Sequence, residues 1–167
     1  ALLQSVTRQQ LRDLLIDNAD EPFAVPLAAA LQGQYVETTT QLAALVRQTL
    51  AAALPRRMPE DEREAETRKT LQRTFQALRI AVNDEFAVLE RFLSLLPSCL
   101  KPGGRVAILS FHSGEDRRVK KAFQTGERAG IYARVAPELI RPSFEERRAN
   151  PRSGSAKLRW AVAARRA

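Results

Sequence analysis

The stretch LKPGGRVAILSFHSGEDRRVKKAFQTG, residues 100–126, decides the fold. Its KPGG turn is followed at 106–109 by a continuous apolar run, which is typical of a strand covered on both faces of a parallel sheet. A polar loop at 110–113 comes next, and the pattern after it predicts a helix over about 114–125, closed by Gly126. Strand, polar loop and helix in this order predict an α/β sheet with a ligand site at the carboxyl end of the strand.

The composition excludes several classes of protein. A chain of 167 residues with 44% hydrophobic content is long enough for one domain with a real core. Its single cysteine, Cys99, excludes an internal disulfide framework, and no Cys/His cluster points to a metal, so we expect no metal and a reducing, cytoplasmic compartment. No apolar run reaches the roughly 18 residues of a membrane span. The first residue is Ala1 rather than Met, so we expect a fragment or a processed chain.

The net charge of +8 is concentrated in the C-terminal part of the chain. Residues 1–98 hold 11 Lys and Arg against 13 Asp and Glu, whereas residues 99–167 hold 16 against 6. Only five of the 27 cations are lysines, and the arginine fork suits phosphates and base edges. A polyanionic partner explains this pattern, and so does a solvated surface in an arginine-rich chain.

Helical patterns divide the N-terminal part. Capping boxes and apolar spacing predict helices over residues 8–17, 20–33 and 39–55, the second bent at Pro26. We therefore expect a helical lobe over 1–55. Ten of the fourteen residues at 56–69 are charged, which predicts a flexible linker, and 70–167 forms the remainder.

The remainder follows a βαββ pattern around the central strand. Apolar residues recur every three or four positions over 73–96, predicting one long core helix. Residues 131–141 and 156–164 are predicted strands, separated by a capped helical turn at 143–146 and a loop at 150–154. The last strand alternates apolar side chains with Lys157 and Arg159.

Several segments resemble a known family. RTFQALRIAVNDEF (73–86), LKPGGRVAILSFHSGEDRRVK (100–120) and NPRSGSAKLRWA (150–161) are similar to signature segments of the bacterial RsmH/MraW family, S-adenosylmethionine-dependent methyltransferases that act on 16S rRNA. DEPFAVPLAAAL (20–31) and VETTTQLAALV (36–46) fit its inserted helical lobe more weakly. The resemblance covers nearly the whole chain, and several long segments in the right order are more specific than one short motif.

The resemblance implies a partial class I (Rossmann-like) S-adenosylmethionine-dependent methyltransferase sheet with an inserted all-α helical lobe. It implies methylation of the N4 amine of a cytidine in the decoding centre of 16S rRNA, and 16S rRNA within the small ribosomal subunit as partner. In this family the Gly-rich first turn, the acidic residue that binds the cofactor's ribose and the loop facing the target amine lie in the N-terminal half. We therefore interpret the chain as the C-terminal half, with no cofactor-binding residue of its own. The alternative is a non-catalytic RNA-binding or assembly module derived from that enzyme.

Candidate site residues follow from the loop and the basic segments. The catalytic candidates are Ser110, His112 and Ser113. The RNA-binding candidates are Arg73, Arg79, Asn83, Asn150, Arg152, Ser155, Lys157 and Arg159. His112 could act as a base or contact RNA, or it could hydrogen-bond at the helix start for structural reasons.

Two local features near the loop carry expectations of their own. Ser113 and Asp116 form the predicted N-cap pattern, and Gly114 stands where the family usually has an apolar residue, which we expect to loosen the helix start. If the strand at 105–110 lacks a neighbour, its open edge predicts a homodimer or pairing with another polypeptide.

Overall fold

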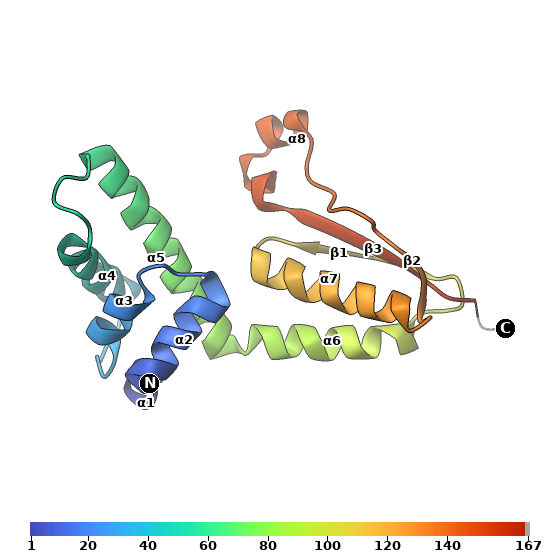
Figure 1. Ribbon diagram of the computed structural model, residues 1–167, viewed down its shortest axis with the longest axis horizontal. Helices are drawn as coiled ribbons and strands as arrows, with labels where there is room; N and C mark the ends of the chain where they lie inside the picture. Colours follow the sequence, from blue (N-terminus) through green and yellow to red (C-terminus); the bar gives the residue numbers. More distant parts are fainter. Residues whose placement is uncertain (166–167) are drawn as a thin grey trace. The chain divides into compact units, whose positions relative to one another are not determined.

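The structure is a computed structural model that describes residues 1–165 (Figure 1). The chain divides into two compact units, Ala1–Asp84 and a second unit that begins at Glu85. The first unit is helical and the second contains a three-stranded antiparallel sheet, so the chain as a whole is of mixed α/β class.

The first unit packs its helices around a leucine-rich core. Capping boxes at Thr7 and Thr38 start two of the helices, as the sequence predicts. Leu11, Leu27 and Leu50 are completely buried there. The helices are α1 (Leu2–Ser5), α2 (Arg8–Ala19), α3 (Ala24–Leu31), α4 (Thr39–Ala53) and α5 (Glu60–Asn83). Because α3 begins at Ala24, Pro26 lies in its first turn, where a missing N–H costs no hydrogen bond and no bend is needed.

The predicted flexible linker at 56–69 is wrong for most of its length, because α5 begins at Glu60. Three acidic residues in its first turn suit the positive end of a helix dipole. Thr70, immediately after this segment, is completely buried. The charged residues therefore form the outer side of a helix whose inner side joins the core, and the helical unit extends to residue 84.

The single long helix predicted over 73–96 is two helices. Asp84 has a left-handed backbone (φ 52°, ψ 37°), which ends α5, and α6 (Glu85–Cys99) starts immediately after it. Aspartate is among the few residues that adopt this conformation readily. One left-handed residue ends the helix without interrupting the apolar spacing, so the sequence pattern does not reveal the break.

The second unit has the predicted βαββ order. Its strands are β1 (Arg105–Ser110), β2 (Tyr132–Val135) and β3 (Lys157–Ala163), and the remaining elements are α7 (Ser113–Arg128), α8 (Phe144–Ala149) and the 3₁₀ turn η1 (Pro151–Ser155). The sheet order is β1-β3-β2, with β3 antiparallel to both neighbours. The prediction that the strand at 105–110 joins a parallel neighbour is therefore wrong within the described sheet.

Helices cover only one face of this sheet. Helix α7 packs against all three strands, and α6 packs against α7 (Figure 1). Val119 and Phe123 of α7 share a core with Ala161 of β3. Ala107 and Leu109 point away from this core and are exposed. The run at 106–109 is thus covered on one face by residues 1–165, and not on both as predicted.

Side chains of β3 alternate between the two faces of the sheet as predicted, but its largest apolar side chains do not lie on the buried face. Arg159, Ala161 and Ala163 are buried toward α7, whereas Trp160 and Val162 lie on the uncovered face. Small alanine side chains allow a helix to approach the sheet closely.

Helix α7 runs two residues past Gly126, where the sequence predicts its end. A Cβ at Gly126 would lie 2.5 Å from Cδ2 of Tyr132, so glycine here makes room for the tyrosine ring. That ring packs edge-on against Phe123, with centroids 5.4 Å apart. The strand predicted over 131–141 is shorter in the structure. It spans Tyr132–Val135, and beyond it Ile140 forms only an isolated bridge to Leu158.

Candidate functional site

The loop after β1 is built around His112, which caps α7. The backbone N–H of Glu115 donates to Nδ1 of His112 at 3.4 Å, and Oε2 of Glu115 accepts from the N–H groups of Phe111 (3.0 Å) and His112 (3.4 Å). The capping residue is therefore His112, and not Ser113 as the sequence predicts. The N–H groups of Phe111, His112 and Glu115 are thus bonded within the chain.

The side chain of His112 is held on several sides. Its Nε2 lies 3.4 Å from Oε1 of Glu115, and its ring lies 5.8 Å from the ring of Phe86 between centroids. Only 13% of the side chain is exposed. Of the two roles that the sequence leaves open, this geometry fits the structural one, in which the imidazole fixes the start of α7.

The two serine candidates have different surroundings. Ser110 is buried, and its hydroxyl donates to the backbone carbonyl of Lys157 on β3 at 3.4 Å. Ser113 is the first residue of α7 and is exposed. Of the three catalytic candidates, Ser113 is thus the one whose hydroxyl lies at the surface.

Phe86 and Arg118 support the same helix start from α6 and α7. The guanidinium of Arg118 lies 3.4 Å above the Phe86 ring, donates to Glu90 at 2.9 Å and donates to the carbonyl of Gly114 at 3.2 Å. A Cβ at Gly114 would lie 2.6 Å from Cζ of Phe86. Glycine at 114 therefore lets Phe86 pack against the loop, which accounts for the departure from the family pattern.

Arg159, a predicted RNA contact, has a partner inside the protein. Its guanidinium binds the Asp116 carboxylate through two hydrogen bonds of 2.6 and 3.1 Å. Arg159 is 8% exposed, so it is not available at the surface. It ties β3 to α7, and we revise its predicted role to a structural one. Sequence reasoning missed this pairing because Arg159 alternates with larger apolar residues and is therefore expected to face solvent.

The other predicted RNA contacts fall into two groups, one in each unit. On α5, Arg73 is bound to Glu66 at 3.1 Å, and Arg79 and Asn83 are exposed. The second group lies together on the loop that leads into β3: Asn150, Arg152, Ser155 and Lys157. Here the Asn150 side chain accepts from the N–H of Arg152 at 3.2 Å, and Lys157 Nζ donates to the carbonyl of Ser155 at 3.1 Å.

A buried carboxylate in the helical unit was not predicted. Glu21 is 2% exposed, and its Oε1 accepts from the N–H of Phe23 at 2.8 Å and from the Thr70 hydroxyl at 3.5 Å. Arg73 Nη1 lies 4.0 Å from Oε2. Burial raises the pKa of Glu21, because desolvation outweighs these favourable contacts. The one sequence feature that could have pointed to Glu21 is its position shortly before the apolar helix α3.

A Gly-rich turn where a strand leads into a helix is the feature expected of an S-adenosylmethionine site. The strand-to-helix turn at 110–113 contains no glycine, and the N–H groups of Phe111, His112 and Glu115 are bonded within the chain. The loop after β1 therefore does not fit such a site. Residues 1–165 hold no group of three or more His, Cys, Asp or Glu side chains placed for a metal ion. In the same part of the chain, no helix is both long and apolar enough to cross a bilayer.

Comparison with known proteins identifies the relatives. The model of the MraW methylase family matches residues 1–164. The chain is 47% identical over 167 residues to "Ribosomal RNA small subunit methyltransferase H 1" of Lachnoclostridium phytofermentans, covering 97% of this chain and 44% of that protein. It is 48% identical over 169 residues to "Ribosomal RNA small subunit methyltransferase H 2" of Alkaliphilus metalliredigens, covering 98% and 47%.

The chain thus spans about half the length of the curated relatives it matches. Both matches cover nearly all of the chain, including the helical unit and the sheet. The family model likewise extends over both units. The chain therefore belongs to the MraW methylase family.

Proposed function

We propose that the chain is the substrate-side C-terminal half of a methyltransferase that uses S-adenosylmethionine to methylate the N4 amine of a cytidine in the decoding centre of 16S rRNA. The observation that carries this proposal is the family match over residues 1–164, together with relatives named as methyltransferases of the small-subunit rRNA. We further propose that the sheet is part of a larger class I (Rossmann-like) sheet and that the protein acts in the cytoplasm on the small ribosomal subunit.

The proposed role of the loop after β1 is to position the target base. The exocyclic amine of cytidine is a poor nucleophile, because its lone pair is delocalised into the ring. Catalysis therefore depends on orienting the amine and accepting its hydrogen bonds. The exposed hydroxyl of Ser113, at the first position of α7, is the group in this loop best placed to accept such a bond. His112 keeps the loop rigid through its cap.

We assign the binding site of the methyl donor to a polypeptide segment outside this chain. When bound, S-adenosylmethionine supplies the methyl group. The start of α7 supports this assignment, because the turn at 110–113 has no glycine and the N–H groups of Phe111, His112 and Glu115 already have partners.

The proposed RNA contacts in the second unit are Asn150, Arg152, Ser155 and Lys157. From residue 85 onward the sequence holds 17 Lys and Arg against 8 Asp and Glu, which favours a phosphate backbone as partner. Arg152 is exposed next to the helical turn that Asn150 caps, so its backbone position is fixed while its guanidinium reaches solvent. On α5, Arg79 and Asn83 remain proposed contacts.

Calorimetry with S-adenosylmethionine, with and without a decoding-stem oligonucleotide of 16S rRNA, tests this function. We expect no cofactor binding to the chain alone and RNA binding that weakens steeply with salt. Arg152→Gln should reduce the slope of log K against log salt by about 1, whereas Arg91→Gln, an exposed arginine on α6, should leave it unchanged. Cofactor binding by the chain alone would refute our assignment of the cofactor site. Absence of RNA binding would refute the substrate-side role.

The second candidate function is a non-catalytic RNA-binding or assembly module. The self-capped helix start favours it as well, since a module of this kind needs no cofactor. Mixing the chain with the part of the Lachnoclostridium relative outside the matched stretch separates the two. Methyl transfer to the oligonucleotide in the mixture supports the enzyme half. RNA binding without methyl transfer supports the module.

The free edge of β1 supports a further part of the proposal. Within the described sheet, β1 is hydrogen-bonded on one side only, to β3. Such an edge recruits another strand. We propose that residues 105–110 pair with a second copy or with another polypeptide. A monodisperse monomer in sedimentation analysis at high concentration would contradict the second-copy alternative.

A further inference from the structure

The chain between β2 and β3 forms an arm, residues 141–156, that contains α8 and η1. The two ends of the arm are held together at the sheet, because Ile140 and Leu158 exchange backbone hydrogen bonds of 3.2 and 2.9 Å. Between α8 and η1, the Asn150 side chain accepts from the N–H of Arg152. In Figure 1 the arm lies beyond the end of the sheet at which β3 begins. The arm is therefore an ordered projection from the sheet.

Helix α8 is exposed at each of its positions, including its one large apolar residue, Phe144. The helix is capped by Ser143, whose hydroxyl accepts from the N–H of Glu146 at 3.1 Å. Phe144 is 68% exposed, more than the exposed phenylalanines Phe92 (49%) and Phe111 (53%). A single exposed apolar residue is common in proteins. Phe144 becomes informative through the side chains that share its side of α8.

Phe144 shares that side with two arginines. Residues three and four positions apart are neighbours on a helix, so Arg147 and Arg148 lie beside Phe144. Glu146 lies on the opposite side, where it borders a hollow of the sheet next to Leu158. The side with Phe144 therefore faces away from the sheet. Within residues 1–165, neither of the two arginines has a side-chain hydrogen bond or an ion pair.

The arm joins the sheet at the same end as the loop after β1. Ser110, the last residue of β1, is the register partner of Lys157, the first residue of β3. The Ser110 hydroxyl also donates to the backbone carbonyl of Lys157. The loop that carries Ser113 and the returning end of the arm are thus neighbours. Nucleotides next to a base held at Ser113 would lie toward the arm.

An outward aromatic ring beside two arginines matches an unpaired nucleotide. Every base has a flat face that can stack on an aromatic ring, and arginines neutralise the phosphates on either side. Proteins recognise RNA mostly at unpaired bases, because neighbouring bases cover these faces inside a helix. An acidic protein segment would also satisfy the arginines. It would gain little from Phe144, since the aromatic residues that dominate protein interfaces lie in well-packed pockets.

We propose that Phe144 stacks on an unpaired nucleotide next to the target cytidine, while Arg147 and Arg148 bind the flanking phosphates. Enzymes that modify a base take it out of the stack, and its neighbours then lose a stacking partner. The ring of Phe144 replaces that partner. The inference rests on the proposed function for its RNA, and it deepens that function by assigning the arm to the single-stranded part of the substrate.

The test uses the decoding-stem oligonucleotide of 16S rRNA with the fluorescent base 2-aminopurine beside the target cytidine. We expect the fluorescence to fall on binding. Phe144→Ala should weaken binding about tenfold and abolish the fluorescence change. Phe144→Tyr should bind like the unmodified chain, whereas Phe144→Leu should resemble Phe144→Ala. Phe92→Ala removes an exposed phenylalanine from α6, is the matched control and should leave binding unchanged.

Salt dependence separates stacking from charge. Arg147→Gln and Arg148→Gln should each reduce the slope of log K against log salt by about 0.7, the value for one phosphate contact on a single strand. Phe144→Ala should lower the affinity without changing this slope, because stacking releases no counterion. With a fully paired form of the same oligonucleotide, Phe144→Ala and the unmodified chain should bind equally.

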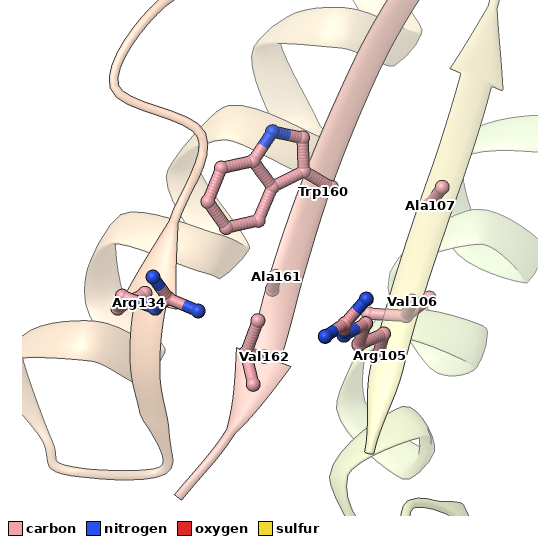
Figure 2. A pocket seen from close by; sticks show the side chains of 7 residues that line it. All are labelled: Arg105, Val106, Ala107, Arg134, Trp160, Ala161 and Val162. Carbon is pink, nitrogen blue, oxygen red and sulfur yellow. The ribbon is translucent and has the colours of Figure 1, made fainter. Parts of the chain in front are cut away.

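Trp160 shows whether each variant is folded, because it is the only tryptophan in the chain. Figure 2 shows it in β3, with Arg134 of β2 on one side and Ala107 of β1 on the other. Its fluorescence therefore follows unfolding of the sheet. Urea unfolding should have the same midpoint in all α8 variants, because α8 has no buried residue.

Three results would overturn the inference: Phe144→Ala that binds the oligonucleotide as tightly as the unmodified chain, Phe144→Leu that binds as well as Phe144→Tyr, and an equal loss in Phe92→Ala. A Phe144→Ala defect seen with whole small ribosomal subunits but not with the oligonucleotide would assign the ring to a protein instead. Absence of RNA binding by the unmodified chain would refute the proposed RNA contacts as a whole. Normal RNA binding by Phe144→Ala refutes this inference alone and leaves the proposed function standing.

Discussion

Arg159 on β3 and Asp116 on α7 form a bidentate ion pair, with N–O distances of 2.6 and 3.1 Å, in which the side chains are only 10% and 14% exposed. The pair connects the central strand of the sheet to the first turn of the helix that covers it. A buried ion pair of this kind stabilises a protein little more than well-packed apolar residues would, but removing one partner leaves an unpaired buried charge.

Asp116→Ala should lower the free energy of unfolding by about 3–5 kcal/mol, because the Arg159 guanidinium stays buried without its carboxylate. The double variant Asp116→Leu/Arg159→Met should recover most of that loss. Urea unfolding measures both. Glu90→Ala is the control: the Glu90 side chain, which pairs with Arg118, is 61% exposed, so its removal should cost less than about 1 kcal/mol. Equal losses in the single and double variants would contradict a role for the pair.

His112→Ala should destabilise the second unit by about 1 kcal/mol, because the cap of α7 is lost, whereas His112→Asn should retain most of the stability. Thermal unfolding of the two variants measures the difference. If asparagine is no better than alanine, the imidazole acts through its packing on Phe86 and not through the cap.

Gly114→Ala should destabilise the chain by about 1–3 kcal/mol, because its Cβ would overlap the Phe86 ring. The smaller side chain in Phe86→Leu should make room for this Cβ. Gly114→Ala should therefore cost less stability when added to Phe86→Leu than when added to the unmodified chain. Gly154→Ala, at a position with open space around the Cβ, is the matched control and should be nearly neutral. Chemical denaturation compares the three, and a neutral Gly114→Ala would show that the loop shifts freely.

Glu21→Gln should change how stability depends on pH. Because burial raises the pKa of Glu21 above its ordinary value of about 4.5, the native state binds more protons than the unfolded state between that value and the raised one. The contribution of Glu21 to stability therefore falls as pH rises through this window. Glu21→Gln should abolish this loss of stability with rising pH. Relative to the unmodified chain, the variant should therefore gain most stability at pH values above the raised pKa.

Urea unfolding of the Glu21 variant at several pH values provides the test, with Glu62→Gln on the exposed side of α5 as control. An unchanged pH profile in Glu21→Gln would contradict the raised pKa. A change of the same size in Glu62→Gln would instead indicate a general charge effect.

Local chemistry made much of the fold predictable. The capping boxes at Thr7 and Thr38 identify helix starts because the residues that satisfy each other are three apart in sequence. The βαββ order followed from strand length and from the turn residues between strands. The left-handed Asp84 was not predictable, because a single residue that ends a helix leaves the apolar spacing intact.

The loop after β1 was predictable in position but not in detail. The strand, loop and helix follow one another as predicted, but the capping residue is His112 rather than Ser113, a difference of one position that depends on the side chain of Glu115. The pairing of Arg159 with Asp116 joins positions 43 residues apart, and sequence alternation alone cannot show that an arginine points inward. The position of Trp160 on the uncovered face of the sheet follows from the same contact, since an inward Arg159 places its neighbour Trp160 on the opposite face.

The strand order β1-β3-β2 has a consequence for biosynthesis. The central strand is the last of the three in the sequence, and neither β1 nor β2 has another partner within the described sheet. During translation the sheet cannot form until residues 157–163 have left the ribosome, whereas the helical unit can fold beforehand. A nascent chain that stalls just before Lys157 would expose two unpaired strands and the apolar side of α7 together, which makes that stage of synthesis the one most exposed to aggregation.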